Sequence, residues 1–333
     1  MILHLMHNDK FILPFIKFIN LNFDKKEHKF IIINDSDDSE LIHIDNVEFR
    51  NSNQELRSIV LPYMKKYKKI ILHGLFRKRI VELLYTNPYL LQKCYWIMWG
   101  GDFYFPEKQN AKQSYIIQNV AYLVTGTKGE VTYVRKYYQA KGQHIKAFVY
   151  TSNLYKNIGD SYKNNGNTIK ILVGNSSTLT NQHKEIFAKL VQYKNQNIQI
   201  YVPLSYGDYK YGMEVMKDGY ELFGNKFKPL IHLLKEDEYY NFLKTIDIAI
   251  MYHSRQQGMG NIITLLGMGK KVYMNPAITT FNMLKDLNIE IFDFHNFNLN
   301  LLESNISIKN QEIIKKNFSE KQFIKQLNNI FYL

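Results

Sequence analysis

The chain lacks most features that would set it apart from ordinary globular proteins. Its 333 residues include one cysteine, Cys94, so no internal disulfide can form and the fold does not depend on an oxidising compartment. No stretch reaches the roughly 18 uninterrupted apolar residues of a membrane span. The segment Met1–Asp9 lacks the basic and then apolar pattern of a signal peptide, and it is predicted to be a first strand. Any membrane contact is therefore expected to be peripheral.

Acidic residues are outnumbered by basic ones. Lys and Arg number 43 against 30 Asp and Glu, which gives a net charge of +13 at pH 7. Such a field attracts phosphates, whether on a nucleotide, a lipid or a nucleic acid. The basic residues form no long stripe and no recognised nucleic-acid motif is present, so nucleic-acid binding is not expected. The net charge by itself is explained equally well by a surface that keeps the protein soluble.

Strand-like and helix-like segments alternate from end to end, without an internal repeat or a low-complexity tract. Short apolar runs separated by helical patterns are typical of parallel strands buried on both faces. Between 151 and 168 this pattern lapses into polar sequence rich in Asn and Gly, which indicates a linker. The predicted strands lie at 1–6, 29–33, 69–72, 94–98, 122–125 and 145–150 before the linker, and at 169–173, 198–202, 247–252 and 271–274 after it.

The alternation predicts an α/β protein made of two doubly wound, Rossmann-like domains. We place them at 1–152 and 168–318, followed by a closing helix at 319–333 that packs back on the N-terminal domain. In such domains ligands bind outside the carboxyl ends of the parallel strands. Two of these edges facing each other would form a deep cleft. The fold alone does not determine the activity.

Loops after the strands of the second half carry the main candidate ligand-binding residues. The loop after 169–173 combines a glycine with hydroxyl groups that suit phosphate oxygens, although an ordinary strand-to-helix turn has the same composition. The loop after 247–252 opens a helix through two glycines and adds Arg255, whose guanidinium suits a diphosphate at a helix N-terminus. A third loop offers a tyrosine ring for a base or sugar, or merely an exposed tyrosine. The candidates are Gly174, Asn175, Ser176, Ser177, Tyr206, Gly207, Tyr252, Arg255, Gln256, Gln257, Gly258, Gly260 and Asn261.

Three strand ends in the first half carry residues suited to a second substrate. Asp102 and His73 are candidate general bases that would deprotonate a hydroxyl group. The alternatives are that Asp102 caps a turn and that His73 is a loop histidine with its hydrogen bonds satisfied. Basic and aromatic residues at 65–69 and 76–79 suit anionic lipid headgroups or a pyrophosphate, or they are solvated helix ends. The residues expected to hold the second substrate are Asn8, Asp9, Lys10, Gly100 and Gly101.

Several motifs occur in a fixed order along nearly the whole chain. They are His73-Gly74, Trp99-Gly100-Gly101-Asp102-Phe103-Tyr104, Ile171-Leu172-Val173-Gly174-Asn175-Ser176, Val202-Pro203 with Tyr206-Gly207, and Arg255-Gln256-Gln257-Gly258. Together these motifs resemble glycosyltransferase family 56, the TDP-N-acetylfucosamine:lipid II transferases, also described as 4-alpha-L-fucosyltransferases. The first-strand loop with Asp9 also fits.

The resemblance implies a GT-B fold, a TDP-sugar donor bound mainly by the C-terminal domain, no metal or other cofactor, and an undecaprenyl-pyrophosphate-linked saccharide as acceptor. It implies a hexosyltransferase in the cytoplasm, peripherally bound to the anionic inner face of a bacterial cell membrane. Its product would be enterobacterial common antigen or a related surface polysaccharide. The commonest retaining GT-B enzymes carry a Glu pair near the helix that follows Gly258, and no acidic residue occurs here from His253 through Lys271. The alternative activity is a sugar-nucleotide 2-epimerase of the same fold, which needs no acceptor.

Overall fold

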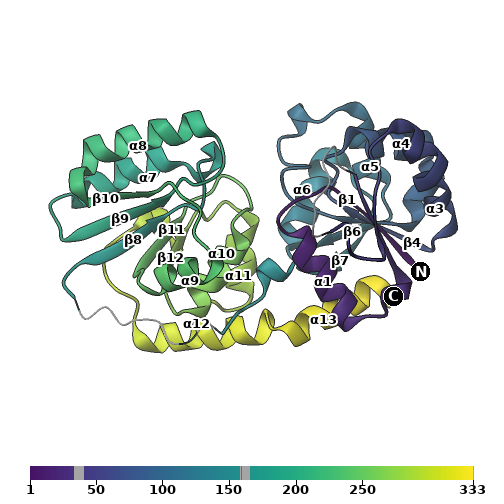
Figure 1. Ribbon diagram of the computed structural model, residues 1–333. Helices are drawn as coiled ribbons and strands as arrows, with labels where there is room; N and C mark the ends of the chain where they lie inside the picture. Colours follow the sequence, from purple (N-terminus) through teal and green to yellow (C-terminus); the bar gives the residue numbers. More distant parts are fainter. Residues whose placement is uncertain (34–40, 158, 160–165, 333) are drawn as a thin grey trace. The chain divides into compact units, whose positions relative to one another are not determined.

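The computed structural model describes residues 1–33, 41–157, 159 and 166–332, and these form two compact units (Figure 1). Unit 1 comprises Met1–Asn153 and the segment from Glu320 onward, and unit 2 comprises Leu154–Ser319. Part of the predicted linker, at 158 and 160–165, lies outside the described residues. No helix among the described residues has both the length and the apolar character needed to cross a bilayer.

Unit 1 is built on a seven-stranded parallel sheet with the order β3-β2-β1-β4-β5-β6-β7. The order reverses between β1 and β4, as in a doubly wound fold. Every residue of β1 and β5 is buried, which is why these strands read as continuous apolar runs. The strands are β1 (Ile2–Met6), β2 (His28–Ile32), β3 (Val47–Phe49), β4 (Lys69–His73), β5 (Cys94–Ile97), β6 (Tyr122–Thr125) and β7 (Gln143–Lys146).

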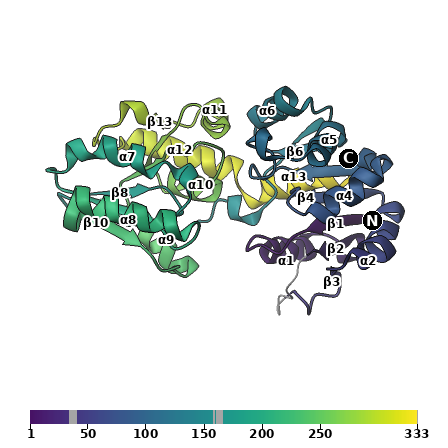
Figure 2. The same cartoon turned by 90° about the horizontal axis from the view of Figure 1, so that it is seen from above.

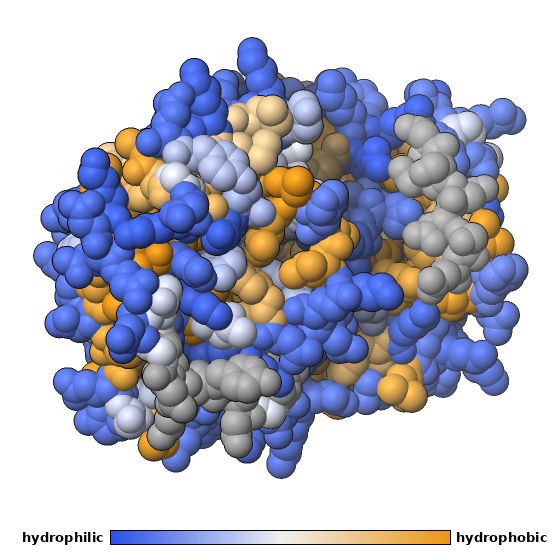
Figure 3. Space-filling view, turned by 60° about the vertical axis from the view of Figure 1, so that its left-hand side comes forward, coloured by the Kyte–Doolittle hydropathy of each residue, from blue (hydrophilic) through white to orange (hydrophobic). Residues whose placement is uncertain are grey.

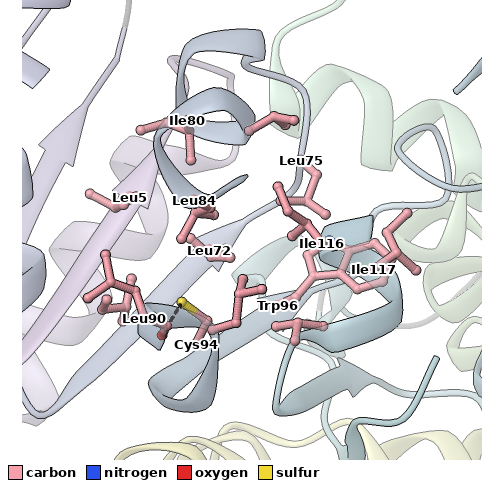
Figure 4. Packing of buried hydrophobic residues seen from close by; sticks show 14 of the residues in the cluster. Leu5, Leu72, Leu75, Ile80, Leu84, Leu90, Cys94, Trp96, Ile116 and Ile117 are labelled. Atoms are coloured by element: carbon pink, nitrogen blue, oxygen red, sulfur yellow. Dashed lines mark hydrogen bonds between the residues drawn. The ribbon is translucent and has the colours of Figure 1, made fainter. Parts of the chain in front are cut away.

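Helices cover both faces of this sheet. One face packs against the helices between β3 and β7, and Figure 4 shows the apolar side chains that fill this layer. Cys94 is buried there, and its thiol donates a hydrogen bond to the Leu90 carbonyl at 3.2 Å, so it is a structural residue. The elements of this face are α2 (Asn53–Glu55), a π turn (Leu56–Val60), α3 (Leu61–Lys66), α4 (Lys78–Thr86), α5 (Ala111–Asn119) and α6 (Lys128–Tyr138).

The opposite face of the sheet packs against α1 (Ile12–Asn22) and the last helix, α13 (Glu320–Tyr332) (Figures 1 and 2). Rings of Phe18 and Phe323 join the two helices, with centroids 5.0 Å apart. The Gln326 side chain accepts a hydrogen bond from the backbone N–H of Phe148 at 2.9 Å. The end of the chain is thus part of the core of unit 1.

Unit 2 contains a six-stranded parallel sheet with the order β10-β9-β8-β11-β12-β13. Helices α7 and α8 lie together on one face, and α10 and α12 lie together on the other (Figure 1). On the face of the molecule in Figure 3, hydrophobic residues are scattered among hydrophilic ones. The strands are β8 (Ile169–Val173), β9 (Ile198–Pro203), β10 (Phe227–Leu230), β11 (Ile248–Met251), β12 (Lys271–Met274) and β13 (Phe292–Asp293). The helices are α7 (His183–Leu190), α8 (Tyr209–Phe223), α9 (Glu236–Lys244), α10 (Met259–Gly267), α11 (Thr279–Asp286) and α12 (Ser304–Asn317).

Candidate functional site

The strand order of unit 2 reverses between β8 and β11, so the carboxyl ends of these two strands lie side by side. Gly174 follows β8 directly, and its backbone N–H donates to the Ile250 carbonyl of β11 at 2.9 Å. Gly174 has φ of +67°, and a Cβ there would lie 2.6 Å from the Asn181 side chain. Only glycine fits this turn, and open α/β sheets bind ligands where the strand order reverses.

Side chains from three loops of unit 2 are joined above this edge by hydrogen bonds. The Asn175 amide donates to the Tyr206 hydroxyl at 3.0 Å and accepts from the Gln257 amide at 3.3 Å. The Thr180 hydroxyl then donates to Gln257 at 2.6 Å. The structure therefore brings together Asn175, Tyr206 and Gln257 from the loops that follow β8, β9 and β11.

The two serines of the first loop are used within the protein. The backbone N–H and the hydroxyl of Ser177 both donate to the Tyr206 carbonyl, each at 2.8 Å. The Ser176 hydroxyl bonds to that of Thr178 at 3.1 Å and accepts from the Asn181 amide at 3.2 Å. Both serines are buried, so in this conformation they brace the loop and do not present hydroxyls to a phosphate as the sequence suggested. Gly207 packs on Ser177 so closely that a Cβ would lie 2.7 Å from its carbonyl oxygen.

The start of α10 is open and polar. Gly258 is the N-cap in the left-handed region, with φ of +64°, and the first backbone N–H groups of the helix follow it. A Cβ on Gly258 would lie 3.3 Å from the Asn175 amide oxygen, so this helix start abuts the three joined loops. Half-buried Arg255 precedes it and donates to the Gln256 carbonyl at 2.9 Å.

Three further predicted residues of unit 2 lie around this start. Gly260 and Asn261 are in the first turn of α10, and the Asn261 side chain makes a hydrogen bond to Tyr239. The Tyr252 hydroxyl instead bonds to Nε2 of His295, beyond β13, at 3.1 Å. The hydroxyl of Tyr252 is therefore engaged at the sheet edge, while Gly260 and Asn261 belong to the helix start.

Sequence reasoning missed two buried histidines beneath these turns. His183 begins α7 and bonds through Nδ1 to the Tyr211 hydroxyl at 3.1 Å, and a Cβ on Gly174 would lie 3.1 Å from its Nε2. His253 follows β11 and lies 3.2 Å from the Cβ position of Gly258. Burial lowers the pKa of His183 to about 4 and that of His253 to about 3, with the positive charge of Arg255 adding to the effect on His253. Both imidazoles are neutral at pH 7 and pack under the glycine turns.

The sheet of unit 1 reverses between β1 and β4, and a small, partly open hollow of about 10 Å³, with room for one water-sized group, lies at their carboxyl ends. His7, the first residue after β1, lines it together with Arg77. The His7 ring contacts the rings of Phe76 and Trp99, with centroids 5.0 and 5.1 Å away. His7 was not selected from the sequence, although its position directly after a buried strand was the available signal.

Asp102 is buried, and its carboxylate accepts hydrogen bonds from its own loop, from β5 and from the loop after β4. Oδ2 accepts from the Trp96 indole at 2.8 Å and from the backbone N–H of Leu75 at 3.1 Å, and Oδ1 accepts from the backbone N–H of Trp99 at 3.0 Å. Burial raises the pKa of Asp102 to about 6, although these hydrogen bonds oppose the rise. At 1% exposure the carboxylate is closed to a substrate hydroxyl in this conformation and holds the turn.

His73 belongs to a chain of hydrogen-bonded side chains that runs across three adjacent strands. Its Nε2 is 3.1 Å from Nδ1 of His4, and Nε2 of His4 is 3.0 Å from Nδ1 of His28. On the other side, Nδ1 of His73 is 2.8 Å from the Tyr150 hydroxyl, which accepts from the Trp99 indole at 2.9 Å. Burial lowers the pKa of His73 to about 3. Both ring nitrogens of His73 are therefore occupied within the core.

The loop residues expected to hold the second substrate lie around the same edge. Asp9 forms the turn that precedes α1, because its carboxylate accepts from the backbone N–H of Phe11 at 3.2 Å and its carbonyl accepts from that of Ile12. Gly100 has φ of +83°, and its carbonyl accepts from the backbone N–H of Tyr104 at 2.9 Å. Asn8 is half-buried, whereas Lys10 and Gly101 are exposed. Within the described part of the chain, no three His, Cys, Asp or Glu side chains gather into a potential metal site.

Two doubly wound parallel sheets, the second with a glycine-opened helix at its switch point, are the architecture of the GT-B fold. Similar solved structures include HepE of Anabaena in complex with UDP, with a TM-score of 0.72 at 13% identity over 98% of each chain. A glycosyltransferase of Rickettsia africae has a TM-score of 0.71 at 14% identity, over 99% of this chain and 97% of that one. The lipopolysaccharide outer core galactosyltransferase WaaB has 0.67 at 11%, over 100% and 99%. These likenesses confirm the predicted fold.

Residues 3–326 match the family model described as 4-alpha-L-fucosyltransferase glycosyl transferase group 56. The chain therefore belongs to glycosyltransferase family 56, and it is a nucleotide-sugar-dependent glycosyltransferase. The family resemblance seen in the sequence motifs is confirmed.

Proposed function

We propose that this enzyme transfers a deoxy-amino sugar of the N-acetylfucosamine type from a TDP-sugar to an undecaprenyl-pyrophosphate-linked saccharide during bacterial surface-polysaccharide synthesis. The observation that carries the donor half is the group of joined loops at Asn175, Tyr206 and Gln257, next to the open start of α10. The nucleotide and the sugar follow the family to which the chain belongs.

The donor diphosphate is proposed to lie at the N-terminus of α10. Backbone N–H groups there carry partial positive charge, and Arg255 adds a full charge at the same place. These groups would stabilise the negative charge that develops on the leaving nucleotide, without a metal ion. The ring of Tyr206, which is 41% exposed, is available to stack on the base or the sugar, and the amides of Gln256 and Asn261 are available to its polar groups.

The acceptor is proposed to approach the carboxyl edge of the sheet in unit 1. The basic and aromatic residues at 76–79 follow β4 and border the hollow, and Phe76 is 40% exposed. The basic and aromatic residues at 65–69 lie at the other end of β4. At a rise of about 3.3 Å per residue, the strand separates this cluster from the one at 76–79 by about 13 Å. Only the 76–79 cluster is positioned to meet the acceptor's pyrophosphate or the anionic headgroups at the cytoplasmic face of a membrane.

A panel of TDP-, UDP- and GDP-sugars in a thermal-shift assay tests the donor, and transfer to a synthetic undecaprenyl-pyrophosphate saccharide tests the acceptor. A TDP-sugar should stabilise the protein most, because ligand binding to the folded state raises its stability. Stabilisation by no nucleotide sugar would refute the donor site, and preference for UDP would refute the nucleotide. Conversion of the sugar nucleotide without acceptor would indicate an epimerase instead.

Arg255→Ala locates the site within unit 2. Loss of one guanidinium at the diphosphate should weaken donor binding at least tenfold, which is about 1.4 kcal/mol. Arg57→Ala is the matched control, since Arg57 is exposed in the π turn of unit 1. Equal donor affinity in the two variants, measured by calorimetry, would remove Arg255 from the proposed site.

A further inference from the structure

We propose that the hollow at the carboxyl ends of β1 and β4 receives the acceptor hydroxyl and that His7 is the general base that removes its proton. This inference rests on the glycosyl transfer proposed above. It names a catalytic residue for that reaction that differs from both bases suggested by the sequence.

Position distinguishes His7 from the other titratable groups at this edge. His73 and Asp102 are each 1% exposed, and their nitrogens and oxygens are occupied by core hydrogen bonds. His7 is half-buried, lines the hollow, and lies where the strand order reverses. The rings of Phe76 and Trp99 flank its imidazole and limit its rotation. A hydroxyl that enters the hollow can therefore reach this imidazole.

Interaction of the His7 ring with the main chain of His73 raises the pKa of His7. Donation of a ring N–H to a carbonyl oxygen has this effect, because it favours the protonated form. In that tautomer the other ring nitrogen keeps its lone pair, as a general base requires.

The surroundings keep His7 neutral before the reaction and support its charge afterwards. Burial is the largest effect and lowers the pKa of His7 below its ordinary value of 6.5, and the positive charge of Arg77 lowers it further. Asp9 acts in the opposite direction and raises it. The other titratable group facing the ring is His73, which stays neutral. The imidazole is thus unprotonated at pH 7, while Asp9 and the His73 carbonyl stabilise the imidazolium formed during transfer.

In the proposed step the acceptor O–H bond breaks and its proton moves to the free ring nitrogen of His7. The oxygen's electron pair forms the new bond to the anomeric carbon of the donor sugar. The bond from that carbon to the donor phosphate breaks, and its electron pair leaves with the nucleotide diphosphate. His7 then releases the proton to water.

The test compares His7→Gln with wild type, using His43→Ala as the matched control. His43 is exposed and lies on the amino-terminal side of β3. It precedes by three residues Asn46, whose carbonyl accepts a hydrogen bond from the backbone N–H of Phe30. Glutamine can still donate to the His73 carbonyl but cannot take up the proton. We expect kcat for transfer to fall about a hundredfold or more, with the KM for the donor within about twofold. The acid side of the wild-type pH–rate profile, where activity falls as His7 becomes protonated, should be absent in His7→Gln. Imidazole should partly restore turnover to His7→Ala.

A measurement on the protein alone separates this inference from the proposed reaction. NMR titration of the His7 Cε1 proton should give a pKa below 6.5, and a His7 that is protonated at pH 7.5 would overturn the assignment whatever the substrates are. If wild type transfers sugar and His7→Gln keeps both its kcat and its acid limb, the base is another group and the proposed function stands. If wild type transfers no sugar under any donor and acceptor, the proposed function fails, and with it the role of His7.

Discussion

Replacing His4 by Phe should destabilise unit 1 strongly, although Phe has nearly the same shape. Wild-type His4 bonds to His73 on one side and to His28 on the other, and its ring stacks on Phe30 with centroids 4.5 Å apart. Phe keeps the stacking but leaves Nε2 of His73 and Nδ1 of His28 without a partner. Each orphaned buried polar group costs about 1–3 kcal/mol, so the free energy of unfolding of unit 1 should fall by about 2–6 kcal/mol.

A second substitution separates the lost hydrogen bonds from a misfit of the new ring. His28→Phe alone leaves Nε2 of His4 without a partner, whereas His4→Phe/His28→Phe removes both atoms of this pair, so the double variant should be about 2–6 kcal/mol more stable than the sum of the two single effects predicts. Residues in direct contact are where such non-additivity is expected. A strictly additive cycle would refute the hydrogen-bonded chain.

The assay follows from the position of the tryptophans. The chain has two, Trp96 and Trp99, and both belong to unit 1, so their fluorescence during urea unfolding reports this unit separately from unit 2. The midpoint and slope give the free energy of unfolding by linear extrapolation. A loss below about 1 kcal/mol in His4→Phe would contradict the calculation, because it is less than the range for two orphaned groups.

Three further substitutions test other parts of the structure. Asp102→Asn keeps only one acceptor oxygen, so at least one of the three N–H donors loses its partner. The free energy of unfolding of unit 1 should fall by about 1–3 kcal/mol in the same assay. A variant that is as stable as wild type but has no turnover would restore Asp102 as the base. Gly258→Ala should cost about 1–2 kcal/mol for its left-handed conformation and also weaken donor binding, whereas Gly224→Ala, which has φ of +53° with ψ of −127° and no atom within 4 Å of its Cβ position, should lose stability without a change in donor binding. Burial raises the pKa of Glu130 from 4.5 to about 7, so the folded protein holds a proton that the unfolded chain releases between these values. This stabilisation is present below pH 4.5, and the free energy of unfolding should fall by about 3 kcal/mol as the pH rises from 4.5 to 7. Glu130→Gln should remove this dependence on pH, as measured by urea unfolding at several pH values across the range.

The central strands were predictable because burial on both faces makes them continuous apolar runs. Strands β3, β10 and β13 were missed, and all three lie at sheet edges with few buried residues, where the pattern is weakest. Strand β7 ends at Lys146 and the run assigned to it continues to 150, because Ala147, Val149 and Tyr150 are buried as a connection after the strand. The apolar pattern identified which residues are buried, but not which of them pair with the neighbouring strand.

A closing helix was predicted at 319–333, and the structure has α13 at Glu320–Tyr332, after a separate helix, α12. Helix α12 ends at Asn317 and α13 begins at Glu320, and the first belongs to unit 2 while the second belongs to unit 1. Ile314, Phe318 and Phe323 are buried before, at and after the break between the two helices. The last helix was expected from the sequence to pack back on the N-terminal domain, and α13 belongs to unit 1.

The sequence showed which polar residues follow the strands, but it did not show whether their hydrogen bonds are already satisfied within the protein. The sequence groups Ser177, Asp102 and His73 with the binding residues because each follows a buried strand. In the structure their polar atoms make hydrogen bonds to backbone groups and neighbouring side chains. His7 escaped notice because it continues an apolar strand by one residue. Exposure at the switch point decides which of these groups can meet a substrate, and exposure is a property of the folded chain.

Both units place neutral histidines beneath the glycine turns at their switch points. His73 precedes Gly74, His183 lies under Gly174, and His253 lies under Gly258. Burial lowers the pKa of each well below 7, so they add no positive charge beneath the loops that we propose bind anionic substrates. The charges that would act on a substrate are carried by half-buried side chains beside these turns, such as Arg255 and Arg77. Substitutions of the buried histidines should therefore reduce stability first and activity through it, whereas substitutions of the half-buried groups should change binding or turnover in a protein that remains as stable as wild type.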